Sequence, residues 1–233
     1  MNKTVKSVIA LIVAISANSA MAESEKWYVG GSAGVSSYGD WSSANITEFR
    51  EGFGSSLGVV NFTGTQSADA DDSSTGYKLF GGYSFHENIS VELSYIDMGE
   101  VDADSNSSGT YSDAMNNSLN GSMFANAKAE VDAFTLDAKL NYPIASSTEL
   151  VAKVGMYYAD TTLNFDASST LSAEVYDYSK SENSSGLHYG IGINFELTEV
   201  IALRAEWEQL DNVEANGGET DVDLLSVSLT YKL

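Results

Sequence analysis

The feature that most constrains this chain is the strict alternation of apolar and polar residues over residues 185–210. Within 187–195 the odd-numbered residues are Leu, Tyr, Ile, Ile and Phe, while His, Gly, Gly and Asn stand between them. After a short turn the alternation resumes over 201–207, where Ala, Arg and Glu separate Ile, Leu, Ala and Trp. A period of two predicts β-strands, and the short connection predicts an antiparallel hairpin. Because small residues and opposite charges share the polar face, we expect that face to line a narrow interior.

The same alternation recurs in eight segments along the chain. They are 27–38, 75–85, 89–99, 127–142, 148–165, the two arms of the 185–210 hairpin, and 222–233. Short turns at 86–88, 143–147 and 197–200 alternate with long polar loops, which we place at 39–74, 102–126, 166–184 and 211–221. This pattern predicts an all-β fold, an eight-stranded antiparallel up-and-down transmembrane β-barrel. The sequence does not determine whether the long loops, which are rich in Asn, Ser and Gly, are ordered.

A soluble lipocalin-like barrel would show the same alternation with its apolar face inside, so a further criterion is needed. Aromatic residues gather near the expected short turns, as in the girdle at a membrane interface. The residues assigned to this girdle are Trp27, Phe85, Tyr142, Phe195 and Tyr231. We therefore expect lipid on the apolar face.

The first 22 residues predict a cleaved secretory signal peptide, with cleavage before Glu23. Residues 23–233 would then form one barrel domain with four long extracellular loops. The chain contains no Cys, which excludes disulfides, thiol chemistry and an acylated-cysteine anchor. Its formal net charge of −22 makes nucleic acid a poor partner.

Several of these segments resemble the eight-stranded transmembrane domain of the OmpA family. The resemblance is carried by residues 27–30, 80–83, 92–95, 138–144, 201–206 and 225–231. It implies an integral barrel of the outer membrane of a Gram-negative bacterium. The chain departs from the family pattern because no peptidoglycan-binding domain follows the barrel and because Leu233 stands where such barrels usually end in Phe. Asn194 occupies a position that is acidic in the family.

Charged residues on the expected inner face form the main candidate site. They are Lys78, Glu92, Asp137, Lys139, Lys153, Arg204 and Glu206. Buried charges must be paired, so we predict a salt-bridge network inside the barrel. The resemblance implies that Glu92, Lys139 and Arg204 match the internal ion pairs of the family. The network could gate ions or act as a polar plug, and a plug is favoured because side chains fill an eight-stranded interior.

Two other chemistries receive little support from the sequence. The acidic loops could bind divalent cations, but 69–72 lacks the Gly and terminal Glu of a calcium loop, so no metal site is predicted. An enzyme needs a base beside a nucleophile, and the two histidines, His86 and His188, fall in a turn and on the inner face. No catalytic residue and no cofactor are therefore expected.

The expected role is structural or surface-interacting, serving envelope integrity or adhesion through the loops. A small ion-conducting pore is the alternative, and a lipid-modifying enzyme is less favoured. The expected partners are outer-membrane lipid and lipopolysaccharide, the barrel-assembly machinery during biogenesis, and an extracellular ligand bound by the acidic loops.

Overall fold

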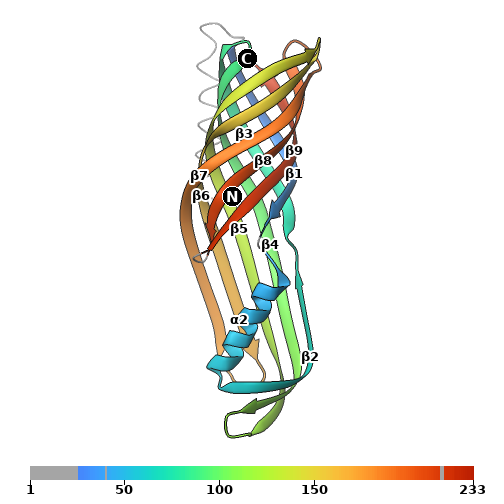
Figure 1. The fold of residues 1–233 in the computed structure, drawn as a ribbon. Coiled ribbons are helices and arrows are strands. Elements are labelled where there is room, and N and C mark those ends of the chain that lie inside the picture. The colour runs from blue at the N-terminus through green and yellow to red at the C-terminus, as the bar shows by residue number, and fades with distance from the viewer. Residues whose placement is uncertain (1–25, 40, 216–217) are drawn as a thin grey trace.

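The computed structural model describes residues 26–39, 41–215 and 218–233, so the expected signal peptide lies outside the described residues. Eight strands close into a ring in the order β1-β3-β4-β5-β6-β7-β8-β9, and every neighbouring pair is antiparallel. The bounds are β1 Trp27–Tyr38, β3 Ser73–His86, β4 Ile89–Asp113, β5 Ser118–Ala145, β6 Thr148–Ser169, β7 Val175–Glu196, β8 Ile201–Ala215 and β9 Gly218–Lys232. The predicted eight-stranded up-and-down barrel is confirmed (Figure 1).

The apolar parity of each strand faces outward. On β9, Leu225 and Val227 expose 62% and 59% of their surface, while Ser226 and Ser228 between them are buried in the interior. A lipocalin-like arrangement would have the opposite orientation and is therefore excluded. An outward apolar band with closed strand edges is the arrangement that lipid requires, because hydrocarbon cannot satisfy an unpaired backbone. Among the described residues, no helix is long and apolar enough to span a membrane.

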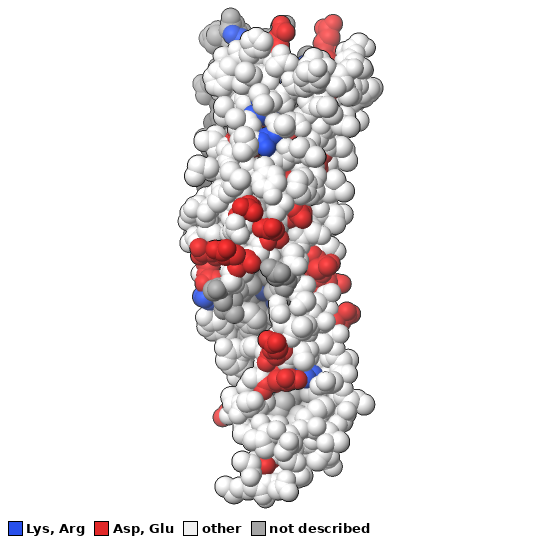
Figure 2. All heavy atoms as spheres, in the orientation of Figure 1, with Lys and Arg blue, Asp and Glu red and all other residues white. Residues whose placement is uncertain are grey.

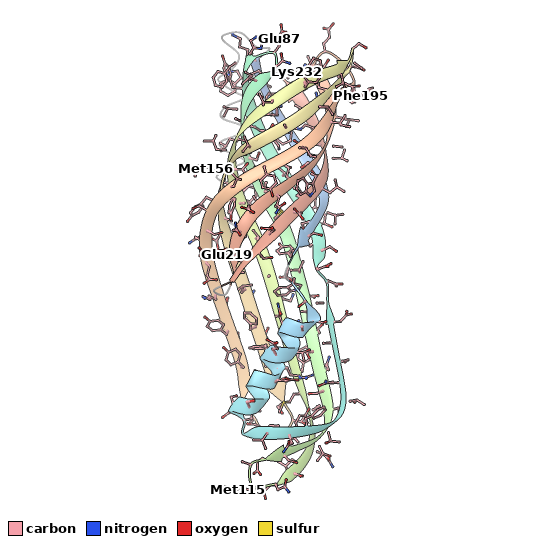
Figure 3. The ribbon with its side chains drawn as sticks, viewed as in Figure 1. Glu87, Met115, Met156, Phe195, Glu219 and Lys232 are labelled. Carbon is pink, nitrogen blue, oxygen red and sulfur yellow. The ribbon has the colours of Figure 1, made fainter. Side chains whose placement is uncertain are left out.

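The four central strands are much longer than a membrane crossing. β4, β5, β6 and β7 contain 25, 28, 22 and 22 residues, whereas a tilted crossing needs about 9–11. The expectation of long irregular loops at 102–126 and 166–184 is therefore wrong: both ranges are mostly strand, with connections of only a few residues. In Figure 3 the tip near Met115 lies at the far end of the molecule, while Glu219 of the β8–β9 hairpin lies about half-way along it.

The loop expected at 39–74 is also ordered, as a helix and a ninth strand. β2, Val59–Ala70, lies outside the ring and pairs with the distal part of β4. α2, Ser43–Ser56, buries Ile46, Arg50 and Phe53, which are spaced as one face of a helix. Its Arg50 donates to the carbonyl of Asn106 on β4 at 3.0 Å and so fixes the helix inside the curved sheet. α2 was not predicted, because the segment around it is polar and contains Gly.

A bulge in β4 explains how one strand pairs with two partners. β4 pairs with β3 as far as Asp97 and with β2 from Ala103 onward. Between these stretches its register to β5 shifts, and Gly99 there has a φ of +73°. An added Cβ at Gly99 would lie 2.6 Å from the carbonyl oxygen of Thr75. Glycine thus permits the extra residue that turns β4 away from the barrel. Beyond this bend lies the extension, which consists of α2, β2 and residues 103–113 of β4, 118–127 of β5, 165–169 of β6 and 175–178 of β7.

Candidate functional site

The interior of the barrel contains a layer of ionisable side chains from six strands. Four basic and four acidic side chains meet there in the described part of the chain, together with one histidine. They are Lys78, Lys139, Lys153, Arg204, Glu92, Asp137, Glu206, Glu208 and His188, and all are buried. Each comes from the inward parity of its strand, opposite the apolar outer positions. The signs balance, which is how a polar layer can be enclosed without leaving net charge in a low-dielectric interior.

Glu92 is the centre of one half of this layer. Arg204 donates to both of its carboxylate oxygens, with Nη1 to Oε2 at 3.0 Å and Nη2 to Oε1 at 3.2 Å. Lys153 Nζ lies 3.3 Å from Oε1, and the Tyr28 hydroxyl donates to Oε2 at 3.1 Å. Lys139 Nζ is farther away, 3.7 Å from Oε2, and stands 4.2 Å from the centre of the Tyr28 ring. Every lone pair of the Glu92 carboxylate thus has a charged or hydroxyl neighbour.

Glu206 and Glu208 form the other half, on consecutive inward positions of β8. Glu206 is 3.0 Å from both Lys78 Nζ and Lys153 Nζ, and its Oε2 is 2.9 Å from Arg204 Nε. Glu208 makes close ion pairs with the same two lysines. Lys153 therefore bridges three carboxylates and joins the two halves of the layer.

His188 extends the layer toward β5. Its Nδ1 lies 2.7 Å from Asp137 Oδ1, and its Nε2 lies 3.6 Å from Glu208 Oε1. Thr135 donates to the other oxygen of Asp137 at 2.7 Å. Histidine and carboxylate are positioned here as internal hydrogen-bond partners, which is the lumenal filler that the strand parity predicts for His188.

An apolar layer closes the interior between the charged layer and the extension. Fourteen buried residues pack together there, and Ile96, Met98, Leu210 and Leu224 each expose 0% of their surface. The Tyr38 hydroxyl crosses this layer and donates to the carbonyl of Gly99 at 2.7 Å. Along the barrel, a layer of paired opposite charges is thus followed by a layer of buried apolar side chains.

All seven sequence-predicted lumen residues come together in the one layer, and two further members are added to them. Glu208 was missed because the alternation of β8 was followed only to Trp207, although one more step of the same parity reaches it. His188 was assigned to the interior, but nothing in the sequence identifies Asp137 as its partner. Asn194 donates to Glu149 at 3.1 Å and lies outside the layer.

The outer face has an aromatic border at each end of the apolar belt. Phe85, Tyr142, Phe195 and Tyr231 are exposed at the end with the short turns, and Trp27 is half-buried with its ring 4.8 Å from that of Tyr83. At the other border Tyr95, Phe134 and Tyr158 are paired across neighbouring strands. Only the first border was anticipated.

Acidic side chains collect beyond the second border. Asp97, Asp132 and Asp160 are direct cross-strand neighbours on β4, β5 and β6. On the face shown in Figure 2, red acidic groups lie over the middle and lower parts of the molecule with few basic groups among them. No group of three or more His, Asp or Glu side chains arranged to hold a metal ion is present in the described residues. The structure therefore presents an acidic surface without a preformed cation site.

Comparison with known proteins agrees with this architecture. The family description of the OmpA-like transmembrane domain matches residues 22–233. Outer membrane protein A of Salmonella typhi is 25% identical over 97% of this chain and 55% of its own length. That of Klebsiella pneumoniae is 26% identical over 88% of this chain and 50% of its own length. The chain thus spans about half the length of the relatives it matches.

Among solved structures, the outer membrane protein OprG from Pseudomonas aeruginosa shares 16% identity with this chain. The match covers 91% of this chain and 98% of that one, with a TM-score of 0.44. The closed eight-strand ring, the outward apolar belt and the family match over residues 22–233 lead to one conclusion. This chain belongs to the family of OmpA-like transmembrane domains and is an integral β-barrel of the Gram-negative outer membrane.

Proposed function

We propose that this protein is a closed membrane anchor and that its extension is a rigid, acidic platform for interactions outside the cell. The observation that carries the proposal is the continuity of β4–β7 from the membrane belt into the extension. The ladder between β4 and β5 pairs residues from Ile89–Leu140 to Ser112–Ser118. Because the same strands form both parts, the platform needs no flexible linker and holds a fixed orientation to the membrane.

The platform has surface features that suit binding to another macromolecule. Val175, Tyr176 and Tyr178 at the start of β7 are exposed by 72%, 41% and 41%. Tyr176 also makes an edge-to-face contact with Phe49 of α2, with ring centres 5.5 Å apart, so the aromatic surface is supported from beneath. Rigid aromatic side chains are enriched at interaction surfaces, and the net negative charge would favour a basic partner.

Shortening the platform tests this role. Removing 103–112 together with 118–127 deletes facing strand segments and keeps the register of the remaining β4–β5 ladder. We expect cells expressing the shortened protein to lose adhesion to host cells or matrix, while the barrel still shows heat-modifiable mobility on gels. Removal of the outward Ile144 side chain, as Ile144→Ala at the other end of the barrel, is the control. Unchanged adhesion by the shortened, folded protein would contradict the proposal.

The charged layer serves, in this proposal, as a plug that holds the barrel shut. The charged layer contains equal numbers of basic and acidic side chains, and the apolar layer lies between it and the extension. Both features support a plug rather than an ion pore. Planar-bilayer recording distinguishes them: we expect no discrete conductance from the wild-type protein. Conductance steps that change in Arg204→Ala would establish the pore instead.

The remaining expectations belong to the same proposal. We infer that the protein has no enzymatic activity, since His188 is enclosed by carboxylates in the lumen. The barrel-assembly machinery would insert the chain, and lipopolysaccharide would surround its platform end. Unaltered lipid A in cells overproducing the protein is the expected result of a test for lipid-modifying activity.

A further inference from the structure

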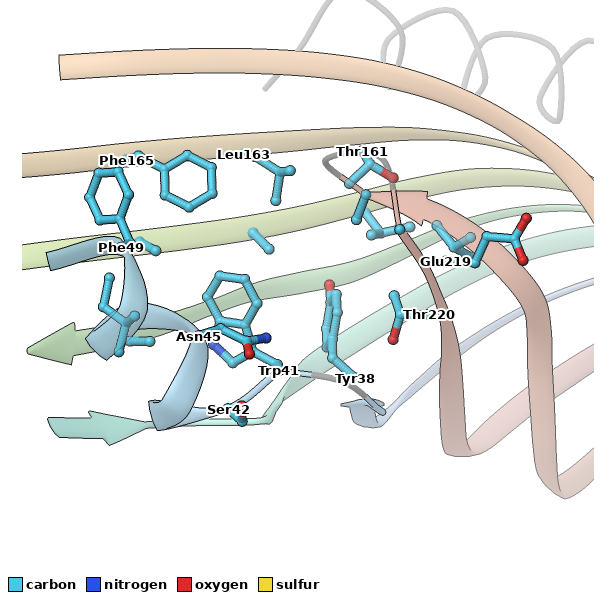
Figure 4. A pocket seen from close by; sticks show the side chains of 18 of the residues that line it. Tyr38, Trp41, Ser42, Asn45, Phe49, Thr161, Leu163, Phe165, Glu219 and Thr220 are labelled. Carbon is cyan, nitrogen blue, oxygen red and sulfur yellow. The ribbon is translucent and has the colours of Figure 1, made fainter. Parts of the chain in front are cut away.

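A cavity of about 580 Å³ lies between the apolar layer of the barrel and helix α2. The apolar layer contributes Tyr38, Val131 and Leu163 to its lining. Phe49 of α2 and Phe165 of β6 form its far wall (Figure 4). Pockets that hold small organic ligands commonly have volumes of roughly 300–1,000 Å³. The cavity is therefore large enough for a small molecule.

Small side chains and unequal strand lengths keep this space open. Ala103, Ala127 and Ala129 cover the wall that faces α2, where larger residues would reach the helix. On the opposite side β8 and β9 end at Ala215 and begin at Gly218, while β5 and β6 continue. The space beside the β8–β9 hairpin thus forms an entrance between that hairpin and the first turns of α2.

The walls combine apolar surface with a buried hydroxyl that has no hydrogen-bond partner. Trp41, Phe49 and Phe165 supply aromatic surface. Thr161 is 1% exposed, lines the cavity, and its Oγ1 has no hydrogen-bond partner. A buried hydroxyl without a partner costs free energy that a ligand with a matching polar group would recover.

The entrance carries negative charge. Glu48 of α2 and Glu219 of the hairpin are both exposed and line the opening. Carboxylates at the entrance repel an anion, and an ion of either sign would lose hydration at the apolar depth near Thr161. The chemistry of the cavity thus selects against fatty acids and for uncharged molecules.

We propose that this cavity binds an uncharged amphiphile with an apolar body and one hydrogen-bonding group, which pairs with Thr161 Oγ1. Neither the plug nor the interaction platform uses this site. The cavity lies between the apolar layer and the extension. A ligand can therefore enter it without passing the charged layer of the barrel.

The three tryptophans of the chain allow a direct test. Trp41 lines the cavity, whereas Trp207 lies on the outer face of β8. In the variant W27F/W207F only Trp41 remains, and in W27F/W41F only Trp207 remains. Each is placed in phosphatidylcholine nanodiscs and titrated with 8-bromooctan-1-ol or 8-bromooctanoate, whose bromine quenches tryptophan on contact. Trp207 reports probe dissolved in lipid, and Trp41 reports probe in the cavity.

We expect saturable quenching of Trp41 by the alcohol, at concentrations where quenching of Trp207 is still linear, and at least fivefold weaker binding of the carboxylate. Thr161→Val in the Trp41 variant keeps the side-chain volume and should weaken binding of the alcohol by about fivefold, the worth of one hydrogen bond. Ala129→Phe should abolish saturation by filling the cavity. Ala152→Phe, on the lipid face of β6, is the matched control and should change nothing.

Three results would overturn the proposal. Quenching of Trp41 that rises linearly with that of Trp207 would show partition into lipid only. Equal binding of alcohol and carboxylate would remove the role of Glu48 and Glu219. Saturable quenching of Trp41 that is unaffected by Thr161→Val would show that the hydroxyl does not bind the ligand. The Thr161→Val result tests the proposal even if Ala129→Phe does not fold.

Discussion

Glu92 should be the most sensitive position of the barrel interior. Its carboxylate contacts Arg204 twice, Lys153 at 3.3 Å and the Tyr28 hydroxyl at 3.1 Å, all without solvent. Glu92→Gln keeps the shape and removes the charge, leaving Arg204 and Lys153 with one buried carboxylate fewer. Removing one partner of a buried ion pair typically costs about 3–5 kcal/mol. We expect a loss of this size in the free energy of unfolding.

Lys139 provides the internal comparison. Its one ion pair in the described structure is the 3.7 Å contact with Glu92, and its ammonium group stands 4.2 Å from the centre of the Tyr28 ring. Lys139→Met keeps the aliphatic stem and removes the positive charge. Because Glu92 still pairs with Arg204 and Lys153, we expect the free energy of unfolding to fall by less than about 1.5 kcal/mol. Glu196→Gln, which breaks a partly exposed pair with Lys232 at 2.7 Å, should cost about 0–1 kcal/mol.

Urea-induced unfolding in phosphatidylcholine vesicles, followed by tryptophan fluorescence and by the shift in gel mobility, measures these differences. The Glu92→Gln loss should persist in 1 M salt, because the group is shielded from solvent, while the Glu196→Gln loss should vanish. Equal losses for Glu92→Gln and Lys139→Met would refute the reasoning, since the effect would then not follow the number of charged contacts. So would a loss below about 1 kcal/mol for Glu92→Gln.

Three further predictions concern the bulge, the lipid face and the acidic surface. Gly99→Ala should lower the free energy of unfolding by at least about 1–2 kcal/mol, because φ is +73° and a Cβ would meet Thr75; denaturant unfolding measures it. Val227→Arg should cost about 2–4 kcal/mol in the same assay, because the residue faces lipid. Partial burial and the neighbouring carboxylates raise the pKa of Glu130 above its ordinary value of 4.5. Its ionised form therefore destabilises the fold, so stability should rise as pH falls through the raised pKa, and Glu130→Gln should flatten that rise.

Each of these has a result that would contradict it. A neutral Gly99→Ala would mean that the bulge relaxes without glycine. A Val227→Arg effect no larger than that of an outward substitution near the tip, such as Met115→Arg, would argue against lipid at Val227. An unchanged pH profile in Glu130→Gln would assign the dependence to Asp132, whose pKa is also raised, chiefly by burial.

The direction in which each strand side chain points follows from the order of residues along the strand. A period of two leaves only two faces, and one buried or lipid-covered face fixes every residue of a strand at once. From Leu187 to Phe195 and from Leu225 to Tyr231 the apolar parity was sufficient to predict the outer surface. The seven lumen charges followed from the same parity, because each lies between apolar neighbours.

Tertiary structure alone decided where the polar segments go and which charges meet. The ladder between β4 and β5 continues beyond the membrane because pairing with a neighbouring strand satisfies the backbone hydrogen-bonding groups, whatever the side chains are. The polar composition of these segments therefore gave no sign that they form strands. Gly99 turns β4 toward β2, and only the closed ring brings Glu92 of β4 beside Arg204 of β8, 112 residues away in sequence. Alternation predicts a face, but the partners across that face depend on strand order, register and the curvature of the sheet.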